Sequence, residues 1–125
     1  MNTLTAIFIS VSIQYHLPPG LLEALCFVET RHVASAIHYD DGGRNSIGIC
    51  QVQYRTAQYL GFDGTEEDLL DPTTNIHYAA KYLSGQISRY HGNLEKAVIA
   101  YNRGNAKDLT TTEYQRKVYI VWRGN

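Results

Sequence analysis

The chain has 125 residues with 12 acidic and 11 basic side chains, which gives a formal net charge of −1. This balance gives no reason to expect binding to nucleic acids or to anionic membranes. A hydrophobic fraction of 44% with 18% charged residues is typical of a globular protein. We therefore expect a single domain over residues 1–125, built around one core.

The first apolar stretch runs from Leu4 to Ile13. It is too short to span a membrane, and it lacks the basic flank and cleavage site of a signal peptide. We expect instead a short buried helix from about Leu4 to Tyr15, which ends before Pro18.

The second expected helix, from Pro19 to Thr30, carries a carboxylate on its apolar face. Leu22, Leu25, Cys26 and Glu29 fall at i, i+3, i+4 and i+7. Burial and the negative end of the helix dipole should both raise the pKa of Glu29 and keep it protonated near neutral pH. Glu29 is thus a candidate general acid, although this stretch alone favours a solvated carboxylate paired with Arg31, and the motifs further along the chain decide between them.

The two cysteines, Cys26 and Cys50, form neither a CxxC motif nor a Cys/His ligand spacing, and the five histidines form no HExxH pair. We therefore expect no metal and no cofactor. One disulfide is an alternative, but we expect two partly buried free thiols.

The middle of the chain loses helical periodicity. Turn-forming residues are dense from Asp40 to Ser46, which predicts a loop or small hairpin within 31–47. The apolar run Ile47–Val52 predicts a short strand or a close-packed turn. A short helix is expected from Tyr54 to Leu60, and in the acidic loop that follows we expect two leucines, 69 and 70, to point inward.

Three further helices are predicted in the second half. Asp71 should cap a long helix that begins at Pro72 and ends before Gly92, Asn93 should cap the next, and Gly104 should stop it. A final amphipathic helix covers Tyr114, Val118, Val121 and Trp122. The fold class is mainly α, with a small loop or hairpin region between the Glu29 helix and the Gly48–Gln51 turn.

Several short motifs stand in a fixed order: an acid with a hydroxyl neighbour, a Gly-to-Gln turn, an Asp-Pro helix start and two late tyrosine motifs. They are Glu29-Thr30, Gly48-Ile49-Cys50-Gln51, Asp71-Pro72-Thr73-Thr74-Asn75-Ile76, Ala100-Tyr101-Asn102-Arg103-Gly104, and Tyr114 with Val118. This order resembles the soluble lytic transglycosylase family from about Leu17 to Val121. The resemblance implies a lysozyme-like (α+β) fold and cleavage of bacterial peptidoglycan between N-acetylmuramic acid and N-acetylglucosamine.

The resemblance also implies roles for individual residues. Glu29 would be the catalytic acid and then the base that closes a 1,6-anhydro ring, and a hydrogen bond from Tyr101 would orient its carboxyl group. Substrate-binding candidates are Thr30, Gly48, Gln51 and Asn102. Gln51 could instead be a structural amide, Gly48 should allow a close approach of glycan or backbone, and for Asn102 we favour a structural role at the helix end.

The loop before Gly48 departs from the family pattern, because it lacks the usual Asn-Pro and carries Asp40 and Asp41. Goose-type lysozymes have an acidic residue in this loop that helps position water, so Asp41 is a possible second acid, with Asp40 beside it. Two alternatives therefore remain: a hydrolytic lysozyme that uses Asp41, and a non-catalytic glycan-binding or structural module of the same fold.

The expected partner is the peptidoglycan strand, with no nucleic acid and no membrane span. Because no signal peptide is recognisable, delivery to the periplasm or cell wall by a bacteriophage virion, a lysis system or a secretion apparatus is expected.

Overall fold

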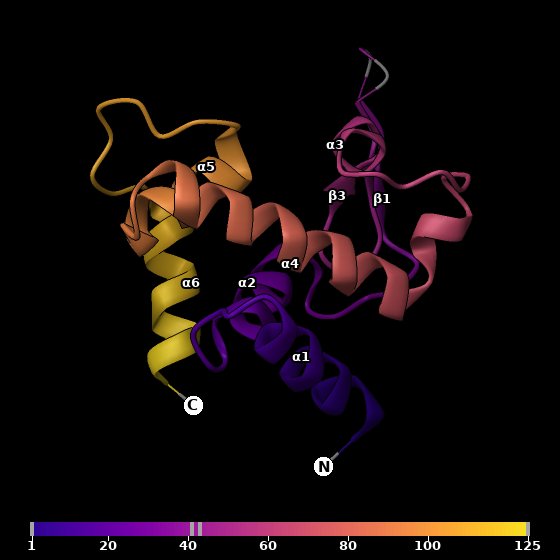
Figure 1. Ribbon diagram of the computed structural model, residues 1–125, viewed down its shortest axis with the longest axis horizontal. Coiled ribbons are helices and arrows are strands. Elements are labelled where there is room, and N and C mark those ends of the chain that lie inside the picture. Colours follow the sequence, from indigo (N-terminus) through magenta and orange to yellow (C-terminus); the bar gives the residue numbers. More distant parts are fainter. Residues whose placement is uncertain (1, 41, 43, 125) are drawn as a thin grey trace.

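The computed structural model describes residues 2–40, 42 and 44–124, and it is mainly helical (Figure 1). The helices are α1 (Thr3–Gln14), α2 (Leu21–Thr30), α3 (Tyr54–Tyr59), α4 (Pro72–Arg89), α5 (Leu94–Arg103) and α6 (Glu113–Arg123), with a 3-10 turn η1 (Asp68–Leu70). The strands are β1 (Ile37–His38), β2 (Ser46–Ile47) and β3 (Val52–Gln53). Asp41, which the sequence analysis named as a possible second acid, lies outside the described residues.

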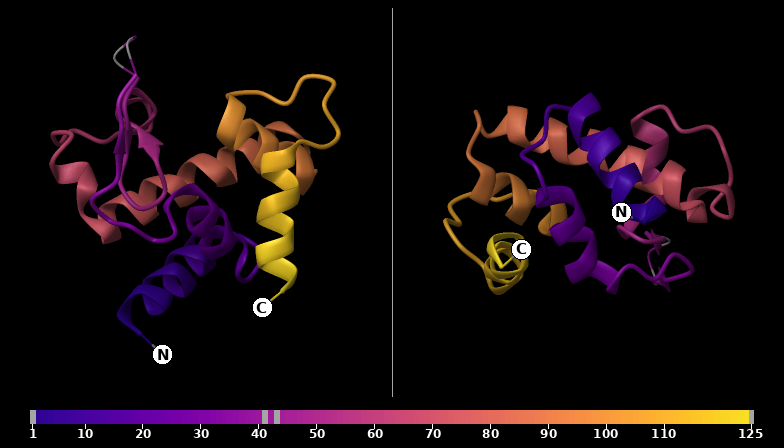
Figure 2. Two further views of the ribbon diagram at one scale, coloured as in Figure 1. Left: turned by 180° about the vertical axis from the view of Figure 1, so that it is seen from behind. Right: turned by 90° about the horizontal axis from the view of Figure 1, so that it is seen from below.

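Helix α4 crosses the middle of the molecule, and α1 and α5 both pack against it (Figure 1). Helix α2 packs along the C-terminal helix α6, as the views in Figure 2 also show. The fully buried side chains come from α2, α4, α5 and α6, for example Leu25, Leu83, Val98 and Val118. This packing brings the end of α2 next to the start of α6, although they are far apart in the sequence.

The predicted helix boundaries are confirmed where capping residues define them. The carboxylate of Asp71 accepts a hydrogen bond from the backbone N–H of Thr74 at 3.0 Å, and Pro72 occupies the first turn. Asn93 caps α5 by accepting from the N–H of Lys96 at 3.1 Å, and Gly104 ends that helix with a φ of 88°.

The predicted hairpin is also present. β1 pairs with β2 and β2 with β3, both antiparallel, so that Ile37 faces Ile47 and Ile47 faces Val52. The run Ile47–Val52 is therefore a strand end, a tight turn and the start of the next strand. In the acidic loop, Leu69 is fully buried as expected, whereas Leu70 is only partly buried.

Candidate active site

A cleft of about 480 Å³ opens between the small sheet and the C-terminal end of α5. One wall includes Ser46 and Gln53 of the strands, and the other includes Tyr101 and Asn102 of α5. Glu29 reaches the cleft from the last turn of α2, and among the described residues that line the cleft it is the only carboxylate. The predicted acid thus lies in a concave site with polar walls.

Burial changes the acidity of Glu29. It raises the pKa of this carboxyl group from its usual 4.5 to about 7, because the charged form loses hydration. The phenol of Tyr114 donates a hydrogen bond of 2.6 Å to Oε2 of Glu29, which acts in the opposite direction and lowers the pKa. The expected rise in pKa is confirmed, and the carboxyl group can carry a proton near neutral pH.

The predicted hydrogen bond from Tyr101 to Glu29 is wrong. The hydroxyl of Tyr101 donates instead to the backbone carbonyl of Cys50 at 2.8 Å, and Tyr114 of α6 supplies the phenol that contacts Glu29. The reason is that α6 packs alongside α2, which spacing in the sequence does not reveal. The sequence feature that could have indicated the contact between Tyr114 and Glu29 is the late tyrosine motif, because it places a phenol on the apolar face of the last helix.

The turn from Gly48 to Gln51 is fixed by one buried amide. Asn75, on α4, donates through Nδ2 to the carbonyls of Ile47 and Leu69, both at 2.8 Å, and its Oδ1 accepts from the N–H of Cys50 at 2.9 Å. In the sequence, Asn75 stands out only as part of the Asp-Pro helix-start motif. All its polar groups are paired, as a fully buried amide requires.

Gly48 makes this arrangement possible. Its φ is 79°, and a Cβ atom added there would lie 2.5 Å from Nδ2 of Asn75 and 3.3 Å from the carbonyl oxygen of Leu69. Gly48 is buried and is not among the residues that line the cleft. The close approach that we expected at this glycine is therefore made by a side-chain amide and a backbone carbonyl of the protein.

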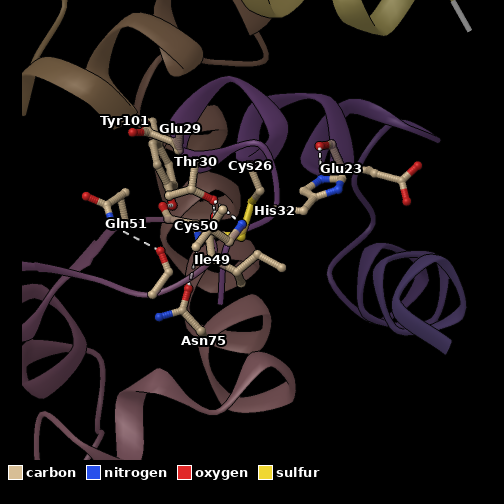
Figure 3. Close-up of a disulfide and its surroundings, with 12 residues drawn as sticks. Glu23, Cys26, Glu29, Thr30, His32, Ile49, Cys50, Gln51, Asn75 and Tyr101 are labelled. Carbon is tan, nitrogen blue, oxygen red and sulfur yellow. Dashed lines mark hydrogen bonds between the residues drawn. A yellow bond between two sulfur atoms is a disulfide. The ribbon is translucent and has the colours of Figure 1, made fainter. Parts of the chain in front are cut away.

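Cys26 and Cys50 form a disulfide, so the expectation of two free thiols is wrong (Figure 3). Cys26 lies one turn before Thr30 on α2, and Cys50 lies in the turn that Asn75 holds. The spacing of 24 residues in the sequence gives no sign that the two Cα atoms lie only 4.4 Å apart. The covalent bond joins the helix that carries Glu29 to the turn that precedes Gln51.

Two of the predicted substrate-binding residues make structural hydrogen bonds (Figure 3). The hydroxyl of Thr30 donates to the carbonyl of Ile49 at 2.7 Å. The Nε2 of Gln51 donates to the carbonyls of Ala36 at 3.2 Å and Gly48 at 3.0 Å, although its side chain also lines the cleft. The structural alternative for Gln51 therefore has a clear geometry, and its contact with substrate stays a prediction.

The remaining predicted residues lie at the surface. Asn102 is exposed on the cleft wall, in the last turn of α5. Asp40 is exposed and does not line the cleft, and its backbone N–H donates to the side chain of Asn45 at 3.1 Å.

Within residues 2–40, 42 and 44–124, no three His, Cys, Asp or Glu side chains come close enough to bind a metal ion. In the same part of the chain, no helix combines the length and apolarity that crossing a bilayer would need.

A mainly helical fold with a small antiparallel sheet and one carboxyl group of raised pKa in a cleft is typical of lysozyme-like enzymes that cleave glycans. Residues 6–120 match the Transglycosylase SLT domain family, and the chain belongs to this family. The resemblance found in the sequence is thereby confirmed.

Similar proteins come from a phage and from enteric bacteria. The chain is 33% identical over 90 residues to peptidoglycan transglycosylase gp16 of Escherichia phage T7, a match that covers 70% of this chain and 6% of that protein. It is 31% identical over 110 residues to protein IpgF of Shigella flexneri, covering 85% of this chain and 72% of IpgF.

An inactive glutamate-to-glutamine mutant of the lytic transglycosylase Slt from Pseudomonas aeruginosa has a similar structure. Its TM-score is 0.75 at 22% sequence identity, and the match covers 93% of this chain and 22% of that one. This likeness confirms the predicted lysozyme-like, mainly α fold.

Proposed function

We propose that this chain is a lytic transglycosylase that cleaves the β-1,4 bond between N-acetylmuramic acid and N-acetylglucosamine in peptidoglycan. The observation that carries the proposal is Glu29, a half-buried carboxyl group with a pKa of about 7 that lines the cleft. Membership of the Transglycosylase SLT domain family and the similarity to a phage protein named as a peptidoglycan transglycosylase support it.

In the first step, protonated Glu29 would donate its proton to the glycosidic oxygen. The bond between that oxygen and C1 of the muramic residue then breaks, the N-acetylglucosamine leaves as an alcohol, and C1 gains oxocarbenium character. Because Tyr114 occupies Oε2, the proton that is transferred belongs on Oε1.

In the second step, the Glu29 carboxylate would accept the proton of the C6 hydroxyl of the same muramic residue. The C6 oxygen attacks C1 and forms a 1,6-anhydro ring, so Glu29 ends the cycle protonated and no water is consumed. The hydrogen bond from Tyr114 favours the carboxylate form that this step requires. A pKa near 7 suits a group that must act in turn as acid and base.

Tyr101, which the sequence analysis named as catalytic, would act as a positioning residue. Its hydroxyl holds the carbonyl of Cys50, and that turn carries Gln51 to the cleft wall. Gln51 and Asn102 remain our candidates for contacts with sugar groups.

The alternative is hydrolysis with Asp41 as the group that positions water. The single-acid reaction is favoured because the chain belongs to the Transglycosylase SLT domain family and is similar to a protein named as a peptidoglycan transglycosylase. A non-catalytic module of the same fold would not need a buried acid with a paired phenol, since burying a carboxyl group in a cleft costs stability at neutral pH.

The proposed site of action is the bacterial cell wall. A relative from a bacteriophage fits delivery by a virion, and we propose this route for the chain or for a larger protein that contains it. Delivery by a secretion apparatus stays a prediction from the sequence.

The direct test is the variant Glu29→Gln in an assay of peptidoglycan clearing. We expect its activity to be lost while its circular dichroism spectrum matches that of the wild type. Glu23→Gln changes an acid on the same helix that does not line the cleft, and it should retain activity. Wild-type-like clearing by Glu29→Gln would overturn the proposal.

A further inference from the structure

The Cys26–Cys50 disulfide joins the two elements that place Glu29 and Gln51 at the cleft (Figure 3). Cys26 lies on α2, one helical turn before Glu29. Cys50 directly precedes Gln51 in the turn that begins at Gly48. The proposed reaction uses neither sulfur atom, so the position of the disulfide calls for another explanation.

Apart from this bond, the helix and the turn belong to different parts of the fold. Helix α2 packs mainly against α6 and α1. The turn is attached to α4, because the side chain of Asn75 accepts from the N–H of Cys50 at 2.9 Å and donates to the carbonyl of Ile47 at 2.8 Å. Reduction of the disulfide would leave the attachment to α4 intact and remove the covalent attachment to α2.

Two hydrogen bonds at the site depend on how closely the turn approaches its neighbours. The hydroxyl of Thr30, next to Glu29, donates to the carbonyl of Ile49 at 2.7 Å. The hydroxyl of Tyr101 donates to the carbonyl of Cys50 at 2.8 Å. Because such O–H···O bonds are found at about 2.5 to 3.0 Å, a shift of the turn by roughly 1 Å would break both.

The space around the two sulfur atoms is closed. Both cysteines are fully buried and share the core with Leu22 and Ile47, and their Cα atoms lie 4.4 Å apart. Two sulfur atoms that are not bonded need a separation of roughly 3.5 Å or more, which is well beyond a covalent bond. Since a close-packed interior offers no room for this expansion, reduction has to displace the turn relative to α2.

The two oxidation states belong to different compartments of a bacterial cell. The cytoplasm, where the chain would be synthesised, keeps thiols reduced, whereas the periplasm and the cell surface allow disulfides to form and persist. The proposed site of action is the cell wall, so the disulfide would form only after the protein has left the cytoplasm.

We infer that oxidation of Cys26 and Cys50 switches the active site on, and that the reduced protein is folded but inactive. In this step the two thiols lose two protons and two electrons to the disulfide of an oxidant, which becomes a dithiol as the Cys26–Cys50 bond forms. The inference rests on the proposed function, because the activity that is switched is the cleavage assigned to Glu29. Burial then shields the new bond from reductants, so the switch acts in one direction.

The reduced protein should keep its fold. A single cross-link supplies only part of the stability of a domain of this size. The other helices keep their packing, and the hydrogen bonds of Asn75 do not involve the sulfur atoms. The expected change is therefore confined to the end of α2 and the turn from Gly48 to Gln51.

The test compares the reduced and the oxidised wild-type protein in the assay of peptidoglycan clearing. The reduced form is purified under a phosphine reductant without oxygen, and its mass confirms two free thiols. We expect its kcat to be lower by about tenfold or more, because the catalytic geometry is displaced, while its circular dichroism spectrum is unchanged. Oxidised glutathione should restore kcat. The double variant Cys26→Ala/Cys50→Ala is the matched control, since its rate should not respond to either reagent.

Equal kcat values for the two folded forms would overturn the inference and leave the disulfide with a purely structural role. A reduced form that is unfolded even at low temperature would also overturn it, because the bond would then be needed for the whole fold. If the oxidised protein shows no clearing at all, the proposed function itself fails, which is a distinct result.

NMR provides a readout that does not depend on activity. Reduction should shift the amide signals of residues 26–30 and 48–51, while the signals of α3 and of the second half of α4 stay in place. Shifts confined to the two cysteines and their immediate neighbours in the sequence, with no effect at Glu29, would contradict the inference.

Discussion

The hydroxyl of Tyr114 lies 2.6 Å from Oε2 of Glu29, and the two residues are 85 positions apart in the sequence. Helix α6 brings this phenol to the end of α2, where the carboxyl group is shielded from water. Burial and the hydrogen bond act on the Glu29 pKa in opposite directions, and burial is the larger effect. The balance between them determines when the acid is protonated.

The first prediction concerns the pH dependence of activity. Since Glu29 must be protonated to donate, and its pKa is about 7, kcat/KM should fall above that pH. The decline should approach about tenfold per pH unit, as for one essential acid. Measuring initial rates of clearing from pH 5 to 9 checks this, and a rate that stays constant up to pH 9 would contradict the assignment.

Removing the hydroxyl group of Tyr114 should shift the pH dependence of activity. In Tyr114→Phe the hydrogen bond that lowers the pKa of Glu29 is lost, so the alkaline limb should shift to higher pH. The maximal rate should also drop by roughly tenfold or more, because the carboxyl group loses its orienting partner. Tyr39→Phe, which alters an exposed ring that does not line the cleft, serves as the control. A lower rate with an unchanged profile would mean that Tyr114 does not tune the acid.

The carboxyl group of Glu29 should also make the free energy of unfolding depend on pH. The folded pKa of Glu29 is raised, so the folded protein binds its proton more tightly than the unfolded chain, and stability is lost as pH rises from 4.5 through about 7. Glu29→Gln removes this penalty. Relative to wild type, the variant should gain up to about 3 kcal/mol in free energy of unfolding above pH 8 and lose that gain near pH 4. Urea denaturation at both pH values measures the difference, and the opposite trend would refute it.

Gly48→Ala tests the packing of the turn. The new methyl group would collide with the Asn75 amide at a residue whose φ is already positive, so we expect a loss of about 2 to 4 kcal/mol in free energy of unfolding. Gly92→Ala is a matched control, since its φ is 87° and no atom lies within 4 Å of the added Cβ. The free energy of unfolding of Gly92→Ala should fall by only about 1 kcal/mol. Equal losses in the two variants would show that the contact with Asn75 is not tight.

Reduction of the Cys26–Cys50 disulfide should destabilise the protein and its site together. A cross-link between residues 24 apart contributes about 3 kcal/mol through the entropy of the unfolded chain. Because both cysteines are fully buried, reduction should require partial unfolding or high reductant concentrations. Melting temperatures with and without dithiothreitol, and those of the double variant Cys26→Ala/Cys50→Ala, check the effect. An unchanged melting temperature after complete reduction would contradict it.

Local features of the sequence were enough to predict much of the fold. Asp71 with Pro72, Asn93, and Gly104 mark helix ends by their own chemistry, so the boundaries that depend on them were correct. The position of Glu29 on an apolar face was also enough to predict the direction of its pKa shift.

Contacts between distant segments were not predictable in this way. Tyr101 was predicted as the partner of Glu29, and the cysteines as free thiols, because nothing in the spacing shows that α6 lies beside α2 or that Cys50 meets Cys26. The three hydrogen bonds of the Asn75 side chain were not predicted for the same reason, because its partners come from two other segments of the chain.

The most direct test of the central claim, that Glu29 alone serves as acid and then base, is the mass of the fragments that the wild-type protein releases from purified peptidoglycan. The single-acid mechanism predicts muropeptides with 1,6-anhydro ends, each lighter by one water than the product of hydrolysis. Fragments with a free reducing end, which carry the added water, would contradict it and point to a second group such as Asp41.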